Sequence, residues 1–534
     1  MAFKREQSSD STEQNQAEQF DQFVINDYKS LPIYSSVDEN ENFLKQVYQD
    51  SSDFVIRKFR IENGPLALIF YIDGLAKTDS VDLAMKALMI LEGHEGHIQQ
   101  IQNHTLPVTQ IAILDNFGDL FVNLLSGDSI LVVEGDQTAI SMGLRGAEHR
   151  SVSEPETEST IRGPREGFNE HLRTNTALIR KKIKSPRLKM KSLVVGTETN
   201  TNVVVSYIQG LADPNLVQEI VSRIEKIKID GILDTGYIEE LIQDSGYSPF
   251  PQMQYTERPD TVAASLLEGR VAVLVDGTPF ALLAPIVFWQ WIQASEDYYE
   301  RFYVGSLLRM LRLLFLFLAL LTPAIYIALS TYHPEMIPTS LLLSIAASRE
   351  AIPFPAVVEA IMMEVAFEAL REAGIRLPKT VGQAVSILGA LVVGQAAVQA
   401  GIVSAAMVIV VSLTGIASFT LPRFNAAISV RMLRFPLMLI ASVFGLLGIV
   451  IGVMFIIAHL AKLRSFGIPY LSPVAPLFPS DFKDIAVRKP WWKMKMRPSF
   501  LKISDEVRLG DFTQKKGFLG GNVGDGQSGD NETS

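Results

Sequence analysis

The sequence predicts a duplicated α/β soluble N-terminal region, followed by an α-helical transmembrane bundle with four clear spans and one broken or interfacial helix. Two observations carry this prediction. Strings with strand and turn character recur in the same order in the N-terminal half. Residues 311–460 are dominated by Leu, Ile, Val, Ala and Gly, whereas residues 1–65 are rich in Asp, Glu, Gln and Ser. A uniform soluble chain would rarely combine a mean hydropathy of +0.20 with 20% charged residues.

Composition divides the chain and excludes several classes of protein. A length of 534 residues exceeds that of one compact domain. The net charge of -10 does not support nucleic-acid binding, and the basic residues flank apolar runs, as they do beside membrane spans. The absence of cysteine excludes disulfides and thiolate metal sites. The N-terminus has no apolar core, so we expect no cleaved signal peptide.

We expect six parts along the chain. They are a disordered polar tail (1–40), α/β subdomain 1 (41–147), an acidic linker with the connector RGPREGF (148–168), α/β subdomain 2 (169–300), a transmembrane helical domain (301–470) and a cytoplasmic tail (471–534).

Repeated strings predict the duplication. YIDGLA at 71–76 matches YIQGLA at 207–212, and LLSG at 124–127 matches LLEG at 266–269, in the same order. Two ordered matches favour a tandem pair over chance. Apolar runs and their spacing predict strands at 54–61, 66–72, 130–133, 203–207 and 271–275, and helices at 80–91, 110–125, 214–227 and 235–243.

Four apolar runs are long enough to cross a bilayer, which takes about 20 residues in a helix. They are 313–331, 381–400, 402–421 and 436–460. Small residues such as Gly382, Gly389 and Gly394 let helix backbones approach closely, which favours a packed bundle or a homo-oligomer.

The segment 340–371 begins as an apolar run, which charged residues and prolines interrupt at 349–355. Several glutamates follow the interruption. Glu364, Glu368 and Glu372 lie four apart on one helix face, and Glu359 lies on another. Ionisable groups at membrane depth usually face protein or water, so these four carboxylates are candidate pore or gate residues. A helix lying in the interface with its acids in water explains the pattern equally well.

The sequence does not determine the transmembrane topology. Basic loops at 371–379, 423–434 and 462–464, together with the tail at 489–497, should share one side under the positive-inside rule, but no simple span count achieves this. Trp491 and Trp492 among lysines suit a headgroup anchor, which favours a cytoplasmic tail.

Signatures of catalysis and cofactor binding are missing. Neither GxxxxGK[ST] nor GxGxxG occurs, and His94, His97 and His104 lack the HExxH spacing, so we expect no enzyme, cofactor or metal site. In the connector, Arg162, Arg165 and Glu166 precede a basic helix and are candidates for an inter-domain or subunit contact.

Several long strings occur in an order that resembles the GerA family, the A subunits of spore germinant receptors. They are RGPREGF at 162–168, LRTNTALIR at 172–180, LLLSIAASRE at 341–350, REAGIRLP at 371–378 and PWWK at 490–493. The resemblance covers about residues 42–500 and implies a multi-pass protein of the spore inner membrane, with its N-terminal region in the cytoplasm.

The resemblance further implies a transporter-like B subunit and a lipoprotein C subunit as partners. It implies that the A subunit oligomerises and forms or gates a channel that releases ions when a partner binds germinant. The carboxylates of 340–371 are then the preferred pore residues. An accessory spore membrane protein, a secondary transporter and a membrane scaffold remain open alternatives.

Overall fold

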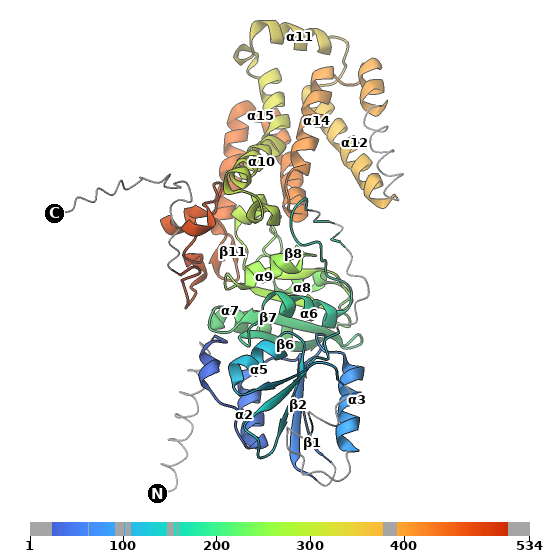
Figure 1. Ribbon diagram of the computed structural model, residues 1–534. Helices are drawn as coiled ribbons and strands as arrows, with labels where there is room; N and C mark the ends of the chain where they lie inside the picture. Colours follow the sequence, from blue (N-terminus) through green and yellow to red (C-terminus); the bar gives the residue numbers. More distant parts are fainter. Residues whose placement is uncertain are drawn as a thin grey trace, which may run out of the picture.

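The computed structural model describes residues 24–61, 64–90, 101, 108–146, 154–155, 157–158, 160–377 and 392–510. Two α/β domains are stacked end to end beneath a helical bundle (Figure 1). Most of the polar tail, the three histidines considered above and residues 378–391 of one expected span lie outside the described residues.

Domain 1 is a five-stranded antiparallel sheet of order β1-β2-β4-β5-β3 with helices on both faces. Its elements are the 3₁₀ turn Asp27–Ser30, α2 (Val37–Val47), β1 (Phe54–Arg60), β2 (Leu66–Ile72), α3 (Thr78–Met89), β3 (Ile111–Leu114), α5 (Phe117–Leu124), β4 (Ser129–Val133) and β5 (Ala139–Met142).

Domain 2 repeats this design with strand order β6-β7-β9-β10-β8. Its elements are α6 (Leu172–Lys182), β6 (Leu188–Val195), β7 (Thr201–Ile208), α7 (Pro214–Glu225), α8 (Thr235–Ile242), β8 (Gln254–Thr256), α9 (Pro259–Leu266), β9 (Val271–Val275) and β10 (Ala281–Ala284). Helices α6 and α9 cover one face of its sheet, and α7 and α8 cover the other.

The repeated strings occupy equivalent turns of the two sheets. Gly74 follows β2 with φ +86°, and Gly210 follows β7 with φ +72°. Gly127 and Gly269 precede β4 and β9 with φ +102° and +84°. Positive φ is accessible to glycine without steric cost, so the repeat preserves the turns that set the strand order.

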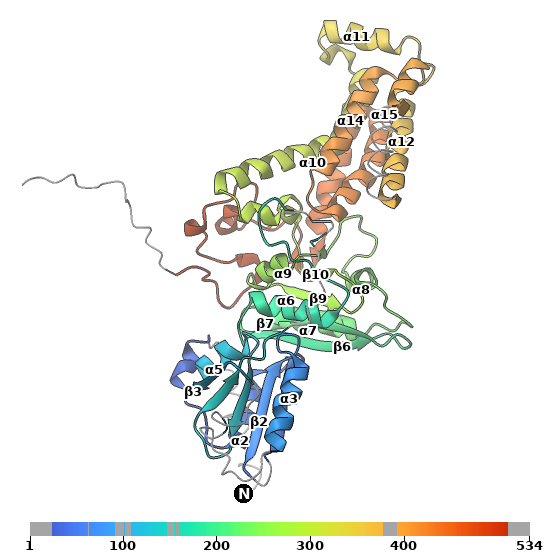
Figure 2. The same ribbon diagram turned by 45° about the vertical axis from the view of Figure 1, so that its right-hand side comes forward.

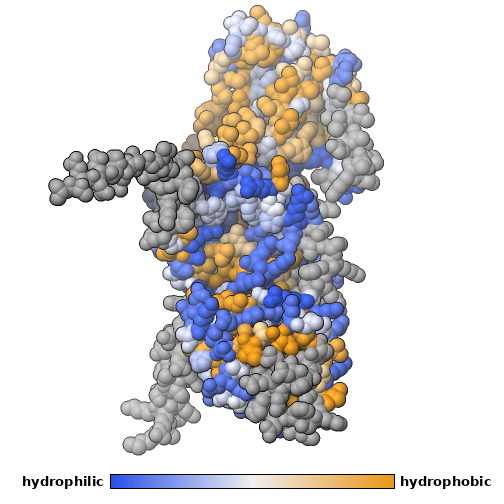
Figure 3. All heavy atoms as spheres, in the orientation of Figure 1, coloured by the Kyte–Doolittle hydropathy of each residue, from blue (hydrophilic) through white to orange (hydrophobic). Residues whose placement is uncertain are grey.

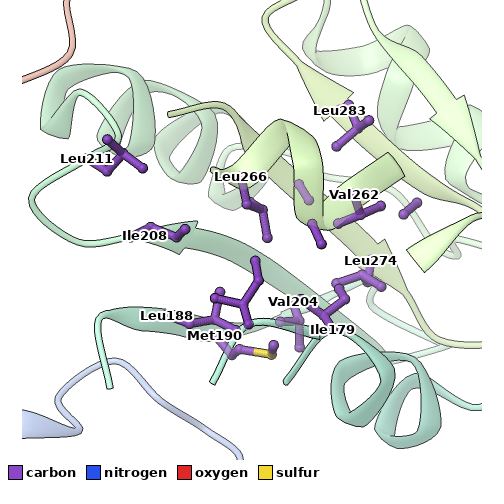
Figure 4. Close-up of a cluster of buried hydrophobic side chains, with 14 of the residues drawn as sticks. Ile179, Leu188, Met190, Val204, Ile208, Leu211, Val262, Leu266, Leu274 and Leu283 are labelled. Carbon is purple, nitrogen blue, oxygen red and sulfur yellow. The ribbon is translucent and has the colours of Figure 1, made fainter. Parts of the chain in front are cut away.

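The core of domain 2 shows why these residues form this sheet. Leu188, Met190, Val204, Ile208 and Leu274 point from neighbouring strands toward the helices above them (Figure 4). Their partners are Ile179 of α6 and Val262 and Leu266 of α9, all fully or nearly fully buried. Burying each such side chain stabilises the fold by about 1.5–3 kcal/mol.

One local prediction is wrong. The helix expected at 110–125 begins at Phe117, and the residues before it form strand β3 at the sheet edge. Asn116 caps α5 by accepting a hydrogen bond from Asp119 N at 2.8 Å. The apolar run of β3 matched a helical spacing by accident, because a four-residue strand is too short to show its own period.

A buried ion pair fixes domain 1 against domain 2. The guanidinium of Arg180 in α6 donates to both carboxylate oxygens of Asp53 at 2.6 and 2.9 Å, and neither side chain is more than 1% exposed. The backbones of Ser52 and Asp50 also hydrogen-bond to Met190 of β6. The two domains therefore form one continuous structure at this edge.

The helical bundle starts directly after domain 2. Its helices are α10 (Phe302–Thr331), α11 (Thr339–Arg349), α12 (Ala356–Arg376), residues 392–399, α14 (Ala405–Phe419) and α15 (Phe424–Lys462). Among the described residues, only α10 and α15 are both long and apolar enough to cross a membrane. The described residues therefore show two long apolar helices instead of the four clear spans expected: α14 has 15 residues, and most of the span expected at 381–400 lies outside the described residues.

Helix α15 is a hairpin that turns at Gly445. This residue has φ 61° and ψ -141°, which is not helical. A Cβ at Gly448 would lie 2.5 Å from Ile440 O, and one at Gly452 would lie 2.4 Å from a methyl group of Leu437. Residues this far apart in a straight helix would not touch, so the segment expected as one span at 436–460 is two antiparallel legs.

Both ends of this hairpin return to domain 2. Ser429 of the first leg donates a hydrogen bond to Pro249 O, and His459 of the second leg lies 2.8 Å from Ser248 Oγ. The hairpin tip lies beside the end of α10, where Tyr332 OH donates to Ser442 O at 2.8 Å. We call the end of the bundle next to domain 2 proximal and the end that carries α11 distal (Figure 1).

The remaining chain returns to domain 2. A short hairpin of β11 (Arg464–Ser465) and β12 (Ile468–Pro469) follows α15, and then come the 3₁₀ turns Pro479–Lys483, Trp491–Lys493 and Ser499–Leu501. Phe500 and Ile503 pack into the hydrophobic core of domain 2 with α9. The hydroxyl of Tyr470 donates a hydrogen bond to Pro251 O. The segment after residue 470 is thus packed on domain 2 beside the base of α10 (Figure 2).

Hydrophobic residues cover most of the visible face of the bundle, whereas polar residues predominate where the bundle meets domain 2 (Figure 3). The outward side chains include Val443, Phe444, Leu447 and Phe455, each at least 59% exposed. A large exposed apolar surface of this kind marks contact with a membrane or with other proteins.

Candidate functional site

The four candidate glutamates all have arginine partners. We call these pairs along α12 the glutamate ladder. Glu359 is its first member, at the distal end of α12, where its side chain is fully buried. Its oxygens accept hydrogen bonds from Arg349 Nε at 3.2 Å and from Ser404 N at 2.9 Å. This carboxylate therefore joins α11, α12 and the start of α14.

Glu364 lies at the centre of the bundle. Its carboxylate is 2.5 Å from the guanidinium of Arg434, and the side chains are 0% and 1% exposed. Arg434 Nε also donates to Ala319 O of α10 at 2.9 Å. One buried ion pair thus ties α12, α15 and α10 together.

Glu368 and Glu372 follow toward the proximal end. Glu368 lies 3.1 Å from Arg371 and 3.5 Å from Arg431 of α15. Glu372 is 61% exposed and pairs with Arg376 one turn further on at 2.5 Å. The exposure of the glutamate side chains in the ladder therefore rises from Glu364, which is buried, to Glu372 at the proximal end, which is exposed to solvent.

This arrangement bears on the pore hypothesis. The structure brings the glutamates together on α12, and each has at least one guanidinium within 3.2 Å. Pairing lowers the cost of burying both charges, and removing one partner would leave the other charge uncompensated. A pore role for these residues therefore requires that the pairs open or that they face a pathway outside the single chain.

The connector residues take different partners. Arg162 lies 3.8 Å from Glu300, which directly precedes the bundle. Arg165 pairs with Glu154 of the linker at 3.2 Å, and Glu166 pairs with Lys181 and Lys182 of α6 at 2.8 and 3.0 Å. Arg162 thus bridges toward the bundle, whereas Glu166 holds the connector to its own domain.

A buried hub that the sequence analysis did not identify holds the connector in place. Arg258 is 1% exposed and donates to Asp260, to Pro164 O at 2.8 Å and to Glu158 O at 3.2 Å. Glu158 in turn lies 2.5 Å from Arg423, in the turn between α14 and α15. The linker is therefore bonded both to domain 2 and to the proximal end of the bundle.

A second cluster missed by the sequence analysis fastens α10 to domain 2 and to the C-terminal segment. We call it the junction cluster. It comprises Asp297, Arg309, Arg312, Asp484 and Arg488.

Asp297 is the centre of the junction cluster. Its carboxylate is fully buried and lies 2.9 Å from Arg309 and 2.7 Å from Arg312. Asp484, from the C-terminal segment, pairs with Arg309 at 2.6 Å. Arg488 donates to Asp297 O at 2.7 Å. The start of α10 and the C-terminal segment, which are remote in sequence, therefore both bond to Asp297: α10 through its carboxylate and the C-terminal segment through its backbone carbonyl.

The electrostatics of the junction cluster are those of a buried network. Burial raises the pKa of the Asp484 carboxyl, although Arg309 opposes this effect. Burial also lowers the pKa of Arg488, and Arg309 Nη2 and Arg488 Nε have no hydrogen-bond partner among the described residues. The arginines at 309 and 312 were the available sequence signal, because two cations inside the start of an apolar helix need carboxylates.

Charged side chains gather in this structure as arginine–carboxylate pairs. No group of three or more His, Asp or Glu side chains in the described part of the chain could hold a metal ion. The titratable residues that do gather are arginine–carboxylate pairs, which fasten elements together instead of presenting a nucleophile.

Two stacked α/β domains, bonded through buried ionic clusters to a bundle with an apolar surface, define a membrane-associated protein built to link soluble domains to its helices. A family described as Bacillus/Clostridium GerA spore germination protein matches residues 42–500. The chain therefore belongs to the GerA family of spore germination proteins.

Known relatives cover nearly the whole chain. The Bacillus subtilis (strain 168) uncharacterized membrane protein YfkQ is 53% identical over 89% of this chain and 93% of its own. Spore germination protein KA of the same organism is 47% identical over 90% and 89%. Spore germination protein GerLA of Bacillus cereus is 41% identical over 90% and 98%.

The chain is also similar to a solved structure. It is the crystal structure of the N-terminal domain of the A subunit of the Bacillus megaterium spore germinant receptor GerK3. It is 35% identical, with a TM-score of 0.37, and covers 48% of this chain and 97% of its own.

Proposed function

We propose that this chain is the membrane A-type subunit of a nutrient germinant receptor that triggers spore germination. Membership of the GerA family over residues 42–500, together with relatives named as spore germination proteins, is the observation that carries this proposal. Its partners are a transporter-like B subunit, which holds the germinant, and a lipoprotein C subunit. The A subunits form a homo-oligomer in the spore inner membrane.

The proximal end of the bundle, with both α/β domains, faces the cytoplasm. Arg371, Arg376, Arg423 and Lys462 all lie at this end, which follows the positive-inside rule. The chain enters the bundle at Phe302 and leaves it at Lys462 beside domain 2, so it passes along the bundle an even number of times. Counting 436–460 as one span had placed the basic loops on different sides of the membrane. With α15 as a hairpin, this segment crosses the bundle twice.

The proposed mechanism is transduction of germinant binding into ion release. Movement of partner subunits shifts α12, and the Glu364–Arg434 pair carries this shift to α10 and α15. The junction cluster and the Glu158–Arg423 pair then connect the bundle to the cytoplasmic domains. Glu359, Glu364, Glu368 and Glu372 are the proposed gate or pore residues, which are exposed to the ion path when the pairs open.

Gene deletion followed by germination assays over a panel of nutrients tests the receptor role. We expect one nutrient response to be lost and to be restored by the wild-type gene. Complementation with Glu364→Gln plus Glu368→Gln tests the gate. Unchanged ion release and selectivity in that strain would remove α12 from the mechanism.

A second candidate is an accessory spore membrane protein that modulates germination without sensing a nutrient. The relative at 53% identity is named only as an uncharacterized membrane protein, which leaves this alternative open. Unchanged responses to every nutrient after deletion, with altered germination kinetics, would favour it. Reconstitution into vesicles without measurable ion flux would favour a membrane scaffold over a channel or a secondary transporter.

A further inference from the structure

The first half of α10 has two faces of opposite character. Tyr303, Leu307, Met310, Leu314 and Phe317 are spaced alternately four and three residues apart, so they form one stripe along the helix. Each is 51–65% exposed. The opposite face carries Arg309 and Arg312 into the junction cluster. One side of this segment is therefore fixed to the protein, and nothing in the described chain covers the other.

Aromatic rings from the C-terminal segment extend this stripe. Trp491 and Trp492 are 42% and 40% exposed. The ring of Trp492 lies edge-on to Phe302 at a centroid distance of 6.0 Å, and Phe302 packs in the same way against Tyr303 at 5.6 Å. Aromatic residues with an apolar body and a polar edge are typical of the membrane–water interface.

Exposed cations surround these rings. Lys489 and Lys493 flank the two tryptophans, and Arg301 precedes α10. The nearby carboxylates Glu296 and Glu300 have arginine partners of their own, at 3.0 and 3.8 Å. Lys489, Lys493 and Arg301 therefore place positive charge at the edge of the aromatic patch, and of these Arg301 also interacts with Glu300.

We propose that this surface, which comprises the exposed stripe of α10 and the Trp491–Lys493 turn, binds the headgroup region of a membrane that contains anionic lipids. The stripe enters the headgroup–acyl boundary, and the lysines contact headgroup phosphates. The stripe lies on the same helix that continues into the bundle, since α10 runs without a break from Phe302 to Thr331. This inference is independent of the receptor role.

Charge favours a lipid surface over a second copy of the same face. A two-fold contact would bring the lysines and Arg301 of both copies together, and like charges across an interface are unfavourable. Anionic headgroups instead complement them. A lipid bound at this surface would also lie close to the junction cluster. The Trp491 ring lies 5.3 Å from the guanidinium of Arg488, and its Nε1 is 3.4 Å from Tyr298 O.

The absence of cysteine from the chain makes site-specific labelling direct. The full-length protein with Leu307→Cys carries an environment-sensitive fluorophore and is reconstituted into phosphatidylcholine vesicles with or without phosphatidylglycerol. The quenchers are lipids with a nitroxide near the headgroup or in the middle of the acyl chain. Leu233→Cys, which is 68% exposed in domain 2, is the matched control.

We expect the Leu307 label to lose fluorescence with the headgroup-proximal nitroxide, more strongly when phosphatidylglycerol is present, while the Leu233 label keeps its fluorescence. Lys489→Gln plus Lys493→Gln should abolish the increase that phosphatidylglycerol causes, whereas Lys86→Gln on domain 1 should not. Inorganic phosphate added to neutral vesicles should not reproduce that increase.

Three outcomes would overturn the proposal. They are equal quenching at Leu307 and Leu233, quenching that does not depend on phosphatidylglycerol, and crosslinking of Leu307→Cys between copies by a bismaleimide without nitroxide quenching. The last outcome would assign the stripe to a contact between copies of the chain.

Discussion

Replacing Gly445 with alanine tests the turn that makes α15 a hairpin. Its φ of 61° and ψ of -141° lie where side chains are strongly disfavoured, which costs about 1–3 kcal/mol. The new Cβ would also lie 3.0 Å from His333 Nε2 and 3.1 Å from Tyr332 Cβ. Strain and crowding together predict a loss of about 2–4 kcal/mol in the free energy of unfolding.

Thermal unfolding of the full-length protein, followed by circular dichroism in lipid nanodiscs, measures this loss. The expected fall in midpoint is about 4–16 °C. Gly467→Ala is the matched control, because Gly467 has φ +79° but no atom within 4 Å of the new Cβ. It should lose only about 1–2 kcal/mol from backbone strain. Equal losses at both positions would show that crowding at the hairpin tip is absent, and no loss at Gly445 would refute the turn.

Three further predictions concern buried charges. Arg180→Met should destabilise the paired domains by about 3–5 kcal/mol in denaturant unfolding, because it leaves Asp53 buried without a cation, and adding Asp53→Leu should restore most of the loss. Arg434→Gln should cost a similar amount and, if α12 gates ion flow, alter ion release from spores; a stable variant with normal release would argue against the gate. Burial raises the pKa of Glu239 to about 7, so the folded state binds more protons than the unfolded state. This contribution to stability should therefore be lost as pH rises from about 4.5 to about 7, and Glu239→Gln should remove it in unfolding titrations.

The soluble fold was largely accessible from the sequence, because its turns require glycine. The repeated strings contain Gly74 and Gly210, which occupy equivalent turns, and the two sheets share one strand order. Strands β3, β5, β6, β8 and β10 were not predicted. For β3 and β8 the reason is length, because three or four residues carry too little periodicity.

The membrane half was less accessible. The apolar run of α15 looks like one span, since glycines are ordinary in membrane helices and a sequence does not show φ and ψ. The length of this helical segment, 39 residues, was the available signal of a hairpin, because a single helix of about 20 residues suffices to cross a bilayer. Likewise, the sequence placed the glutamates on α12 but could not reveal their arginine partners. Arg434 lies 70 residues from Glu364, and only tertiary packing brings them together.

The most direct test of the account is the sidedness of α15 in sealed vesicles. Single cysteines at Phe424, Phe444 and Lys462 are labelled with an impermeant maleimide, with Leu233→Cys marking the side of the α/β domains. A hairpin predicts that Phe424→Cys and Lys462→Cys react from the same side as Leu233→Cys, and that Phe444→Cys reacts from the opposite side. Labelling of Phe424→Cys and Lys462→Cys from opposite sides would contradict the hairpin and the even number of passages derived from it.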